Sequence, residues 1–233
     1  MPTTSSPIST ERSRESRLGP LIGWLALAAI QIALSFASRS SGGAERNPLF
    51  DWAVAVSGIV AYAVLLGLTV AVARGYERPR EALGLRSFER RWLGYAAGGV
   101  LLSLVLGGIL EPFLHAGKEQ GLEPTRWIPD RAGAFVVNAM VVILVAPFAE
   151  ELFFRGLGVR VLAFFGTLPA VAGTAIVFGL AHGLAVALPE LFVFGAVLAW
   201  IRLRSDSVWP GVVAHASYNG IGIALALASI TSK

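Results

Sequence analysis

Residues 133–165 read GAFVVNAMVVILVAPFAEELFFRGLGVRVLAFF, and this run decides the fold. Its first part, 133–149, is apolar apart from Asn138, and apolar character resumes after Arg155. A helix that spans a membrane needs about 20 mostly apolar residues. The run therefore predicts one long membrane helix that carries charged residues inside it.

The composition of the whole chain also indicates a lipid environment. Of 233 residues, 55% are hydrophobic and only 15% are charged, whereas soluble domains have about 25% charged residues. The mean hydropathy is +0.67. These values exclude most classes of water-soluble enzyme. The chain has no cysteine, which excludes disulfides, thiolate zinc sites and a cysteine nucleophile.

Apolar runs elsewhere in the chain predict an all-α, multi-pass transmembrane helix bundle with about seven spans. The sequence Gly-Thr-Leu-Pro at 166–169 is a turn signal that ends the long helix. We predict the spans at 18–37, 52–73, 92–110, 133–165, 170–188, 191–203 and 208–230.

The basic residues predict the orientation. If the N-terminus lies inside, the inner segments hold 13 Lys and Arg residues and the outer segments hold 6. Because cytoplasmic loops carry the excess of Lys and Arg, we predict that the N-terminus lies inside and the C-terminus outside. The basic residues lie in short segments rather than in one stripe, so we expect no nucleic-acid partner.

We predict three parts of the chain. Residues 1–17, which are rich in Ser, Thr, Arg and Glu, form a disordered cytoplasmic tail. Residues 18–132 contain three N-terminal transmembrane helices with their loops. Residues 133–230 form a four-helix core. The loop 111–131, with Trp127 as an interfacial anchor, either caps a cavity or is an ordinary loop.

The charges inside the long helix are the first candidates for function. Glu151 and Arg155 are four residues apart, so they share a helical face and can neutralise each other. Glu150 points about 100° away from Glu151 and is left over. The alternative is that this cluster merely ends the helix at the inner interface, with Arg155 and Arg160 extending to lipid headgroups.

Polar residues in two later spans match the depth of Glu150. Glu150 lies 17 residues before Thr167 and His182 lies 15 after it, so an antiparallel hairpin places the two side by side. His215 and Asn219 are four residues apart on the last span and share a face. A proline at 147 bends the helix near Glu150 and favours a small polar pocket there.

Three motifs carry a family resemblance: Glu150-Glu151-Leu-Phe-Phe-Arg155, Phe178-Gly-Leu-Ala-His182 and His215-Ala-Ser-Tyr-Asn219. In order and spacing they resemble the EExxxR, FxxxH and HxxxN motifs of the CPBP family of intramembrane proteases, also called Abi or CAAX-type proteases. The resemblance covers about residues 133–228, a CPBP-like catalytic core.

The resemblance implies hydrolysis of a peptide bond in a membrane-anchored or transmembrane substrate. By motif position, Glu150 and His182 activate water, and His215 and Asn219 stabilise the oxyanion. Glu151 and Arg155 are orienting residues. It also implies an integral membrane protein, here expected in the bacterial cytoplasmic membrane.

The residues leave two mechanisms open. In the first, Glu150 is a metal-free general base and no cofactor is needed. In the second, a zinc ion bound by Glu150, His182 and His215 activates the water. We favour the first, because zinc would use the only obvious base as a ligand. Rival functions are a non-catalytic membrane binding or immunity protein and a proton-coupled carrier with Glu150 as relay.

Overall fold

The computed structural model describes residues 7–40, 47–115 and 127–231, and within these ranges every regular element is helical. This confirms the all-α prediction. The α-helices are α1 Pro7–Ser40, α2 Trp52–Ala73, α3 Pro79–Ala82, α4 Arg91–Leu114, α6 Ala132–Met140, α7 Ala146–Glu150, α8 Val159–Leu162, α9 Thr174–Ala181, α10 Leu188–Ser205 and α11 Trp209–Thr231. Short 3₁₀ segments are η1 Pro48–Phe50, η2 Pro129–Arg131 and η5 Ala163–Phe165, and π-helical segments are η3 Val141–Val145, η4 Glu151–Gly158 and η6 Pro169–Gly173.

The described helices form a membrane bundle. Five stretches are long and apolar enough to cross a bilayer, and large apolar side chains such as Val60 and Leu101 face outward from them. The predicted fifth span corresponds to the shorter apolar helix Pro169–Ala181, and the predicted sixth span corresponds to α10. The protein is therefore an integral membrane protein, while the count of seven spans and the orientation stay predictions.

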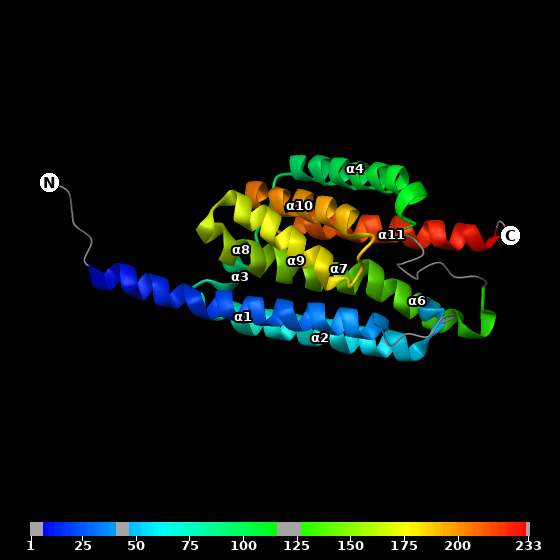
Figure 1. The fold of residues 1–233 in the computed structure, drawn as a ribbon, viewed down its shortest axis with the longest axis horizontal. Helices are drawn as coiled ribbons and strands as arrows, with labels where there is room; N and C mark the ends of the chain where they lie inside the picture. The colour runs from blue at the N-terminus through cyan, green and yellow to red at the C-terminus, as the bar shows by residue number, and fades with distance from the viewer. Residues whose placement is uncertain (1–6, 41–46, 116–126, 232–233) are drawn as a thin grey trace.

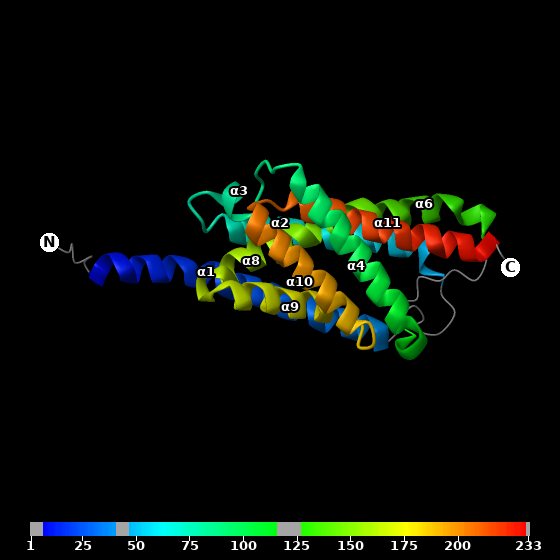
Figure 2. The same ribbon diagram turned by 90° about the horizontal axis from the view of Figure 1, so that it is seen from above.

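The bundle is elongated, with its helices roughly along one direction (Figure 1). α1 and α2 pack side by side on one flank, and α4 crosses α10 and α11 on the other (Figures 1 and 2). The run from α6 through α8 lies between these flanks and contacts α2 on one side and α11 on the other. The start of α1 and the end of α11 lie at opposite ends of the bundle.

The core is centred on η4, in which all eight residues are buried. The indole Nε1 of Trp24 on α1 donates a hydrogen bond to the carbonyl of Phe153 at 3.1 Å. A Cβ at Gly158 would lie 2.8 Å from the same indole. Glycine at 158 therefore allows α1 to approach closely the helix that carries Glu150, Glu151 and Arg155. Apolar side chains pack around these charged residues.

Two predicted boundaries were wrong. The tail predicted at 1–17 is helical from Pro7 onward, and proline fits the first helical position. Residues 1–6 lie outside the described part of the chain. The predicted span 170–188 ends as a helix at Ala181, because Gly183 adopts a positive φ of 64° that ends the helix.

The loop predicted at 111–131 is described only in part, because residues 116–126 lie outside the described ranges. Its helical start extends α4 to Leu114. At its other end, the indole of Trp127 packs edge-on against Phe50 at 5.3 Å and Phe135 at 5.4 Å. Trp127 thus ties the start of α6 to η1, and the predicted interfacial role stays a prediction.

Candidate active site

The helix that carries the carboxylates is continuous but irregular. The predicted span 133–165 forms one run from α6 to η5, with π-helical segments on both sides of α7. Pro147, in the first turn of α7, has no backbone N–H to donate to the preceding turn. π-Helical segments of this kind are frequent at functional sites. They change the directions in which the side chains of Glu150 and Glu151 point, compared with the directions in a regular α-helix.

Glu151, Arg155 and His215 form a buried ionic cluster. Glu151 Oε1 accepts hydrogen bonds from an Arg155 guanidinium nitrogen at 2.8 Å and from His215 Nδ1 at 3.1 Å. Both side chains of the Glu151–Arg155 pair are 0% exposed. The expected pairing therefore forms, and the alternative in which Arg155 extends to lipid headgroups was wrong. Arg160, one turn and a half later, is exposed.

Arg155 is held by more than its carboxylate partner. Its second terminal nitrogen donates to the carbonyl of Gly195 on α10 at 3.2 Å. Its guanidinium lies 4.2 Å from the ring centroid of Phe178 on α9, within the range of a cation–π contact. Arg155 therefore connects the charged helix to α9 and α10 as well as balancing a buried negative charge.

Glu150 lies beside this cluster with one oxygen bound and one free. Its side chain is 5% exposed, and Oε1 accepts a hydrogen bond from the hydroxyl of Tyr62 on α2 at 2.8 Å. Oε2 lies 3.8 Å from His215 Nε2 and has no hydrogen-bond partner among the described residues. A buried carboxylate oxygen without a donor is costly, and one facing an imidazole nitrogen is suited to hold a reacting water.

His182 lies at the end of α9 rather than within a helix as predicted. Its Nδ1 lies 2.8 Å from the Phe178 carbonyl, so Nδ1–H donates there and Nε2 remains available. The ring packs edge-on against Phe178 at 4.6 Å, and Phe178 also contacts His215 at 5.6 Å. His182 is half-buried and lies within electrostatic range of Glu150 and His215.

α1 fixes the backbone at this end of α9. Ser35 Oγ donates to the Ala181 carbonyl at 2.6 Å, and Arg39 Nε donates to the His182 carbonyl at 3.0 Å. These bonds satisfy two carbonyls that the end of the helix leaves without a partner inside it. The first transmembrane helix thus positions a residue of the second motif.

Asn219 shares a face of α11 with His215, as predicted, and turns toward the charged helix. Its amide Nδ2 donates to the carbonyl of Val142 in η3 at 2.8 Å. The structure therefore joins Glu150, Glu151, Arg155 and His215 directly. His182 and Asn219 are each hydrogen-bonded to a backbone carbonyl, of Phe178 and of Val142 respectively.

Sequence reasoning missed three polar residues near the site. Tyr62 is the only tyrosine in the apolar run 52–73, a signal that could have found it. Glu190 falls between the predicted spans 170–188 and 191–203, but it lies buried in the first turn of α10, where it accepts a hydrogen bond from the Tyr218 hydroxyl. The ring of Phe194 stacks on Tyr218 and also contacts His215.

The arrangement was tested as a zinc site. Among the described residues, no group of three or more His, Asp and Glu side chains is placed to hold a metal ion. The zinc ligands predicted from the sequence are Glu150, His182 and His215. In the structure, His182 turns Nδ1 to the Phe178 carbonyl and His215 turns Nδ1 to Glu151. These contacts leave Nε2 of each imidazole for a metal ion or a water molecule, so the zinc alternative stays a prediction.

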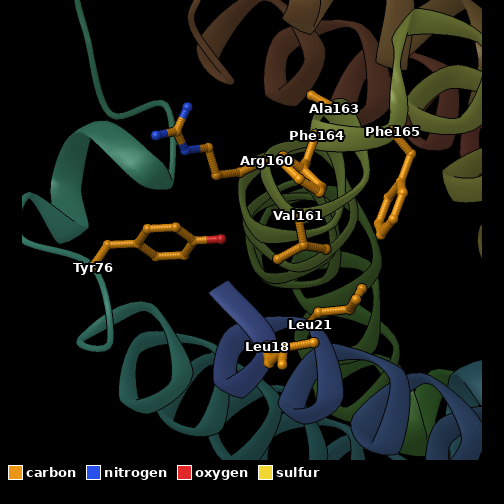
Figure 3. A pocket seen from close by; sticks show the side chains of 8 residues that line it. All are labelled: Leu18, Leu21, Tyr76, Arg160, Val161, Ala163, Phe164 and Phe165. Carbon is orange, nitrogen blue, oxygen red and sulfur yellow. The ribbon is translucent and has the colours of Figure 1, made fainter. Parts of the chain in front are cut away.

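A separate pocket of about 330 Å³ lies at the end of the bundle where α1 meets α8 (Figure 3). On the polar side of the pocket, the guanidinium of Arg160 lies near the ring of Tyr76. Apolar side chains line the rest of the pocket. None of the predicted site residues lines it. The candidate site is therefore the buried polar cluster rather than this pocket, whose lining residues are Leu18, Leu21, Tyr76, Arg160, Val161, Ala163, Phe164 and Phe165.

Gly211 on α11 allows the close approach of that helix to the cluster. A Cβ at this position would lie 2.7 Å from Glu151 Oε2. We expect Gly211→Ala to displace the carboxylate and to lower the free energy of unfolding by about 1–3 kcal/mol, as overpacking does. Gly222 on the same helix has nothing within 4 Å of a built Cβ, so Gly222→Ala is the matched control.

The measurement for this pair is thermal unfolding in detergent, with tryptophan fluorescence as the signal that monitors unfolding. Gly222→Ala is expected to be neutral or stabilising, because alanine favours a helix interior over glycine by about 1 kcal/mol. Equal stability of the two variants would mean that α11 does not approach Glu151 as closely as described.

The comparisons with known proteins concern the segment that contains these motifs. Residues 132–221 match the family model of the Rce1-like type II CAAX prenyl endopeptidases. No curated protein and no solved structure matches the chain. The matched segment includes every predicted site residue from Glu150 to Asn219. The family match confirms the resemblance of residues 132–221 to the CAAX-type proteases.

Proposed function

We propose that the protein is a glutamate-dependent intramembrane endopeptidase, in which Glu150 is the general base. The family supports intramembrane endopeptidase activity in general. The observation that carries the finer proposal is the free, buried Oε2 of Glu150, which faces His215 Nε2 at 3.8 Å. The substrate is a membrane-anchored or transmembrane peptide. The excess of basic residues in the inner segments supports an inside N-terminus, in the bacterial cytoplasmic membrane that the resemblance implies.

The first step is the attack of water on the scissile carbonyl. A water molecule near Glu150 Oε2 transfers a proton to that oxygen while its own oxygen bonds to the carbonyl carbon. The free Nε2 of His182 orients the water from the other side. As the C–N bond breaks, the proton on Glu150 passes to the leaving amine, so the carboxylate is regenerated. No metal ion takes part in any of these steps.

The second requirement is stabilisation of the negative charge on the tetrahedral oxyanion. Glu151 binds Nδ1 of His215, which directs Nε2 toward the Glu150 side, where a protonated Nε2 is a hydrogen-bond donor. The amide of Asn219 is the second donor: one of its two N–H groups is held by the Val142 carbonyl, and the other donates to the oxyanion. Donors fixed before the reaction are effective because they need no reorganisation. Arg155 balances one of the two carboxylate charges.

The test is a cleavage assay with the purified full-length protein in liposomes. The probe is a fluorogenic CAAX-type peptide, prepared in a farnesylated and an unprenylated form of the same sequence. Cleavage of either form, with a new carboxyl terminus identified by mass spectrometry, is expected. No cleavage of either peptide would overturn the proposal and favour a non-catalytic binding or immunity protein.

The same assay tests the absence of a catalytic metal. Protein washed with chelator is expected to keep full activity at less than about one-tenth of a zinc ion per chain, since a catalytic zinc is needed stoichiometrically. Zinc is measured by elemental analysis of the sample that is assayed. Loss of activity on chelation, with recovery at one added zinc per chain, would establish the zinc-dependent alternative.

A further inference from the structure

Tyr62 connects the N-terminal helices to the core that matches the family. It lies on α2, outside the matched segment 132–221, in a run without any charged residue. Its hydroxyl donates to Glu150 Oε1 at 2.8 Å, within the normal range for such a bond. α2 packs along η3, α7 and η4, the part of the charged helix that surrounds Glu150. The contact is thus part of an extended helix interface.

This hydrogen bond distinguishes the two oxygens of Glu150. The terminal torsion of a glutamate side chain is broad, so packing alone does not decide which oxygen faces His215. With Oε1 bound to Tyr62, Oε2 is the oxygen that lies near His215 Nε2 and has no donor among the described side chains. A bond to a charged oxygen is stronger than one between neutral groups. Tyr62 therefore restricts the rotation of the carboxylate.

We propose that Tyr62 is a positioning residue, which holds Glu150 Oε1 and thereby presents Oε2 as the base that takes the proton from water. The inference rests on the proposed function of Glu150. It assigns α2 a direct part in the reaction, so that the catalytic site is built by the N-terminal helices together with the matched core. Tyr62 itself does not contact the reacting atoms in this scheme.

The kinetic test is Tyr62→Phe, which removes the hydroxyl and keeps the ring. We expect kcat to fall about 10- to 100-fold, as for the loss of one hydrogen bond to a charged group, with KM within about twofold. In the Glu150→Gln background the same change is expected to have no further effect. The matched control is Tyr95→Phe, because Tyr95 on α4 is 52% exposed and packs on Trp92. Its kcat is expected to equal that of the unmodified protein.

An infrared measurement tests the contact without any substrate. The band of the Glu150 carboxyl group is identified by subtracting the spectrum of Glu150→Gln. It is expected to shift in Tyr62→Phe and to stay in place in Tyr95→Phe. An unshifted band, or an unchanged kcat in Tyr62→Phe, would overturn the positioning role. If Glu150→Gln is as active as the unmodified protein, the proposed function fails, whether or not the band shifts.

Discussion

Glu150→Gln is expected to lower kcat by roughly 10²–10⁴-fold, the range that general acid–base catalysis contributes. The amide has nearly the same shape as the carboxylate and can still accept the hydrogen bond from Tyr62. It cannot take a proton from water at neutral pH. The side chain is 5% exposed and its Oε2 has no partner among the described residues, so few contacts are lost. The variant is therefore expected to fold and to insert normally.

The measurement is the liposome cleavage assay at saturating peptide. Glu77→Gln is the matched control, because Glu77 lies exposed between α2 and α3 and undergoes the same chemical change. It is expected to keep full activity. If Glu150→Gln cleaves at the rate of the unmodified protein, Glu150 is not the base. If its kcat is retained and only KM rises, Glu150 binds substrate instead.

The fold class was predictable because lipid imposes a simple rule on the sequence. A spanning helix must be long and apolar, and the runs at 52–73 and 133–165 meet that requirement without any knowledge of their neighbours. Hydropathy does not specify where a helix ends inside the apolar region. Gly183 ends α9 through its positive φ, although the apolar sequence continues to 188. That end depends on local backbone conformation and on the contact with α1.

The site was predictable where partners lie on the same helix. The spacing of Glu151 and Arg155 was enough to pair them, and the pair is present. Contacts between helices need the packing itself. No spacing rule connects Tyr62 to Glu150, which lies 88 residues later, or Tyr218 to Glu190. An isolated polar residue in an apolar helix is therefore a useful signal, although it does not name its partner.

The zinc hypothesis illustrates a second limit of sequence reasoning. Residue types and depth placed Glu150, His182 and His215 at one level, which suits both a metal site and a metal-free one. The ring orientations do not separate the two, because each imidazole leaves Nε2 for either a metal ion or a water molecule. Each imidazole has Nδ1 turned to a hydrogen-bond partner, a carbonyl for His182 and the Glu151 carboxylate for His215. Such orientations depend on side-chain torsions that the sequence does not display.

Arg155→Met is expected to lower the free energy of unfolding by about 3–5 kcal/mol, the range for removal of one partner of a buried ion pair. Methionine keeps much of the volume and the apolar part of the side chain. Glu151, which is 0% exposed, would then be buried without its guanidinium, next to the carboxylate of Glu150. The contacts of Arg155 with the Gly195 carbonyl and with the ring of Phe178 would be lost as well.

The measurement is unfolding in mixed micelles of increasing denaturing detergent, with a control pair of the same chemistry. Arg91 and Glu89 are 2.8 Å apart but 64% and 68% exposed, so Arg91→Met is expected to change stability by less than about 1 kcal/mol. The double variant Glu151→Gln/Arg155→Met is expected to be more stable than Arg155→Met, because the uncompensated charge is removed together with its partner. Similar losses for Arg155→Met and Arg91→Met would show that the buried cluster does not hold the helices together. Equal stability of Arg155→Met and the double variant would show that the unpaired charge of Glu151 is not the cause of the loss.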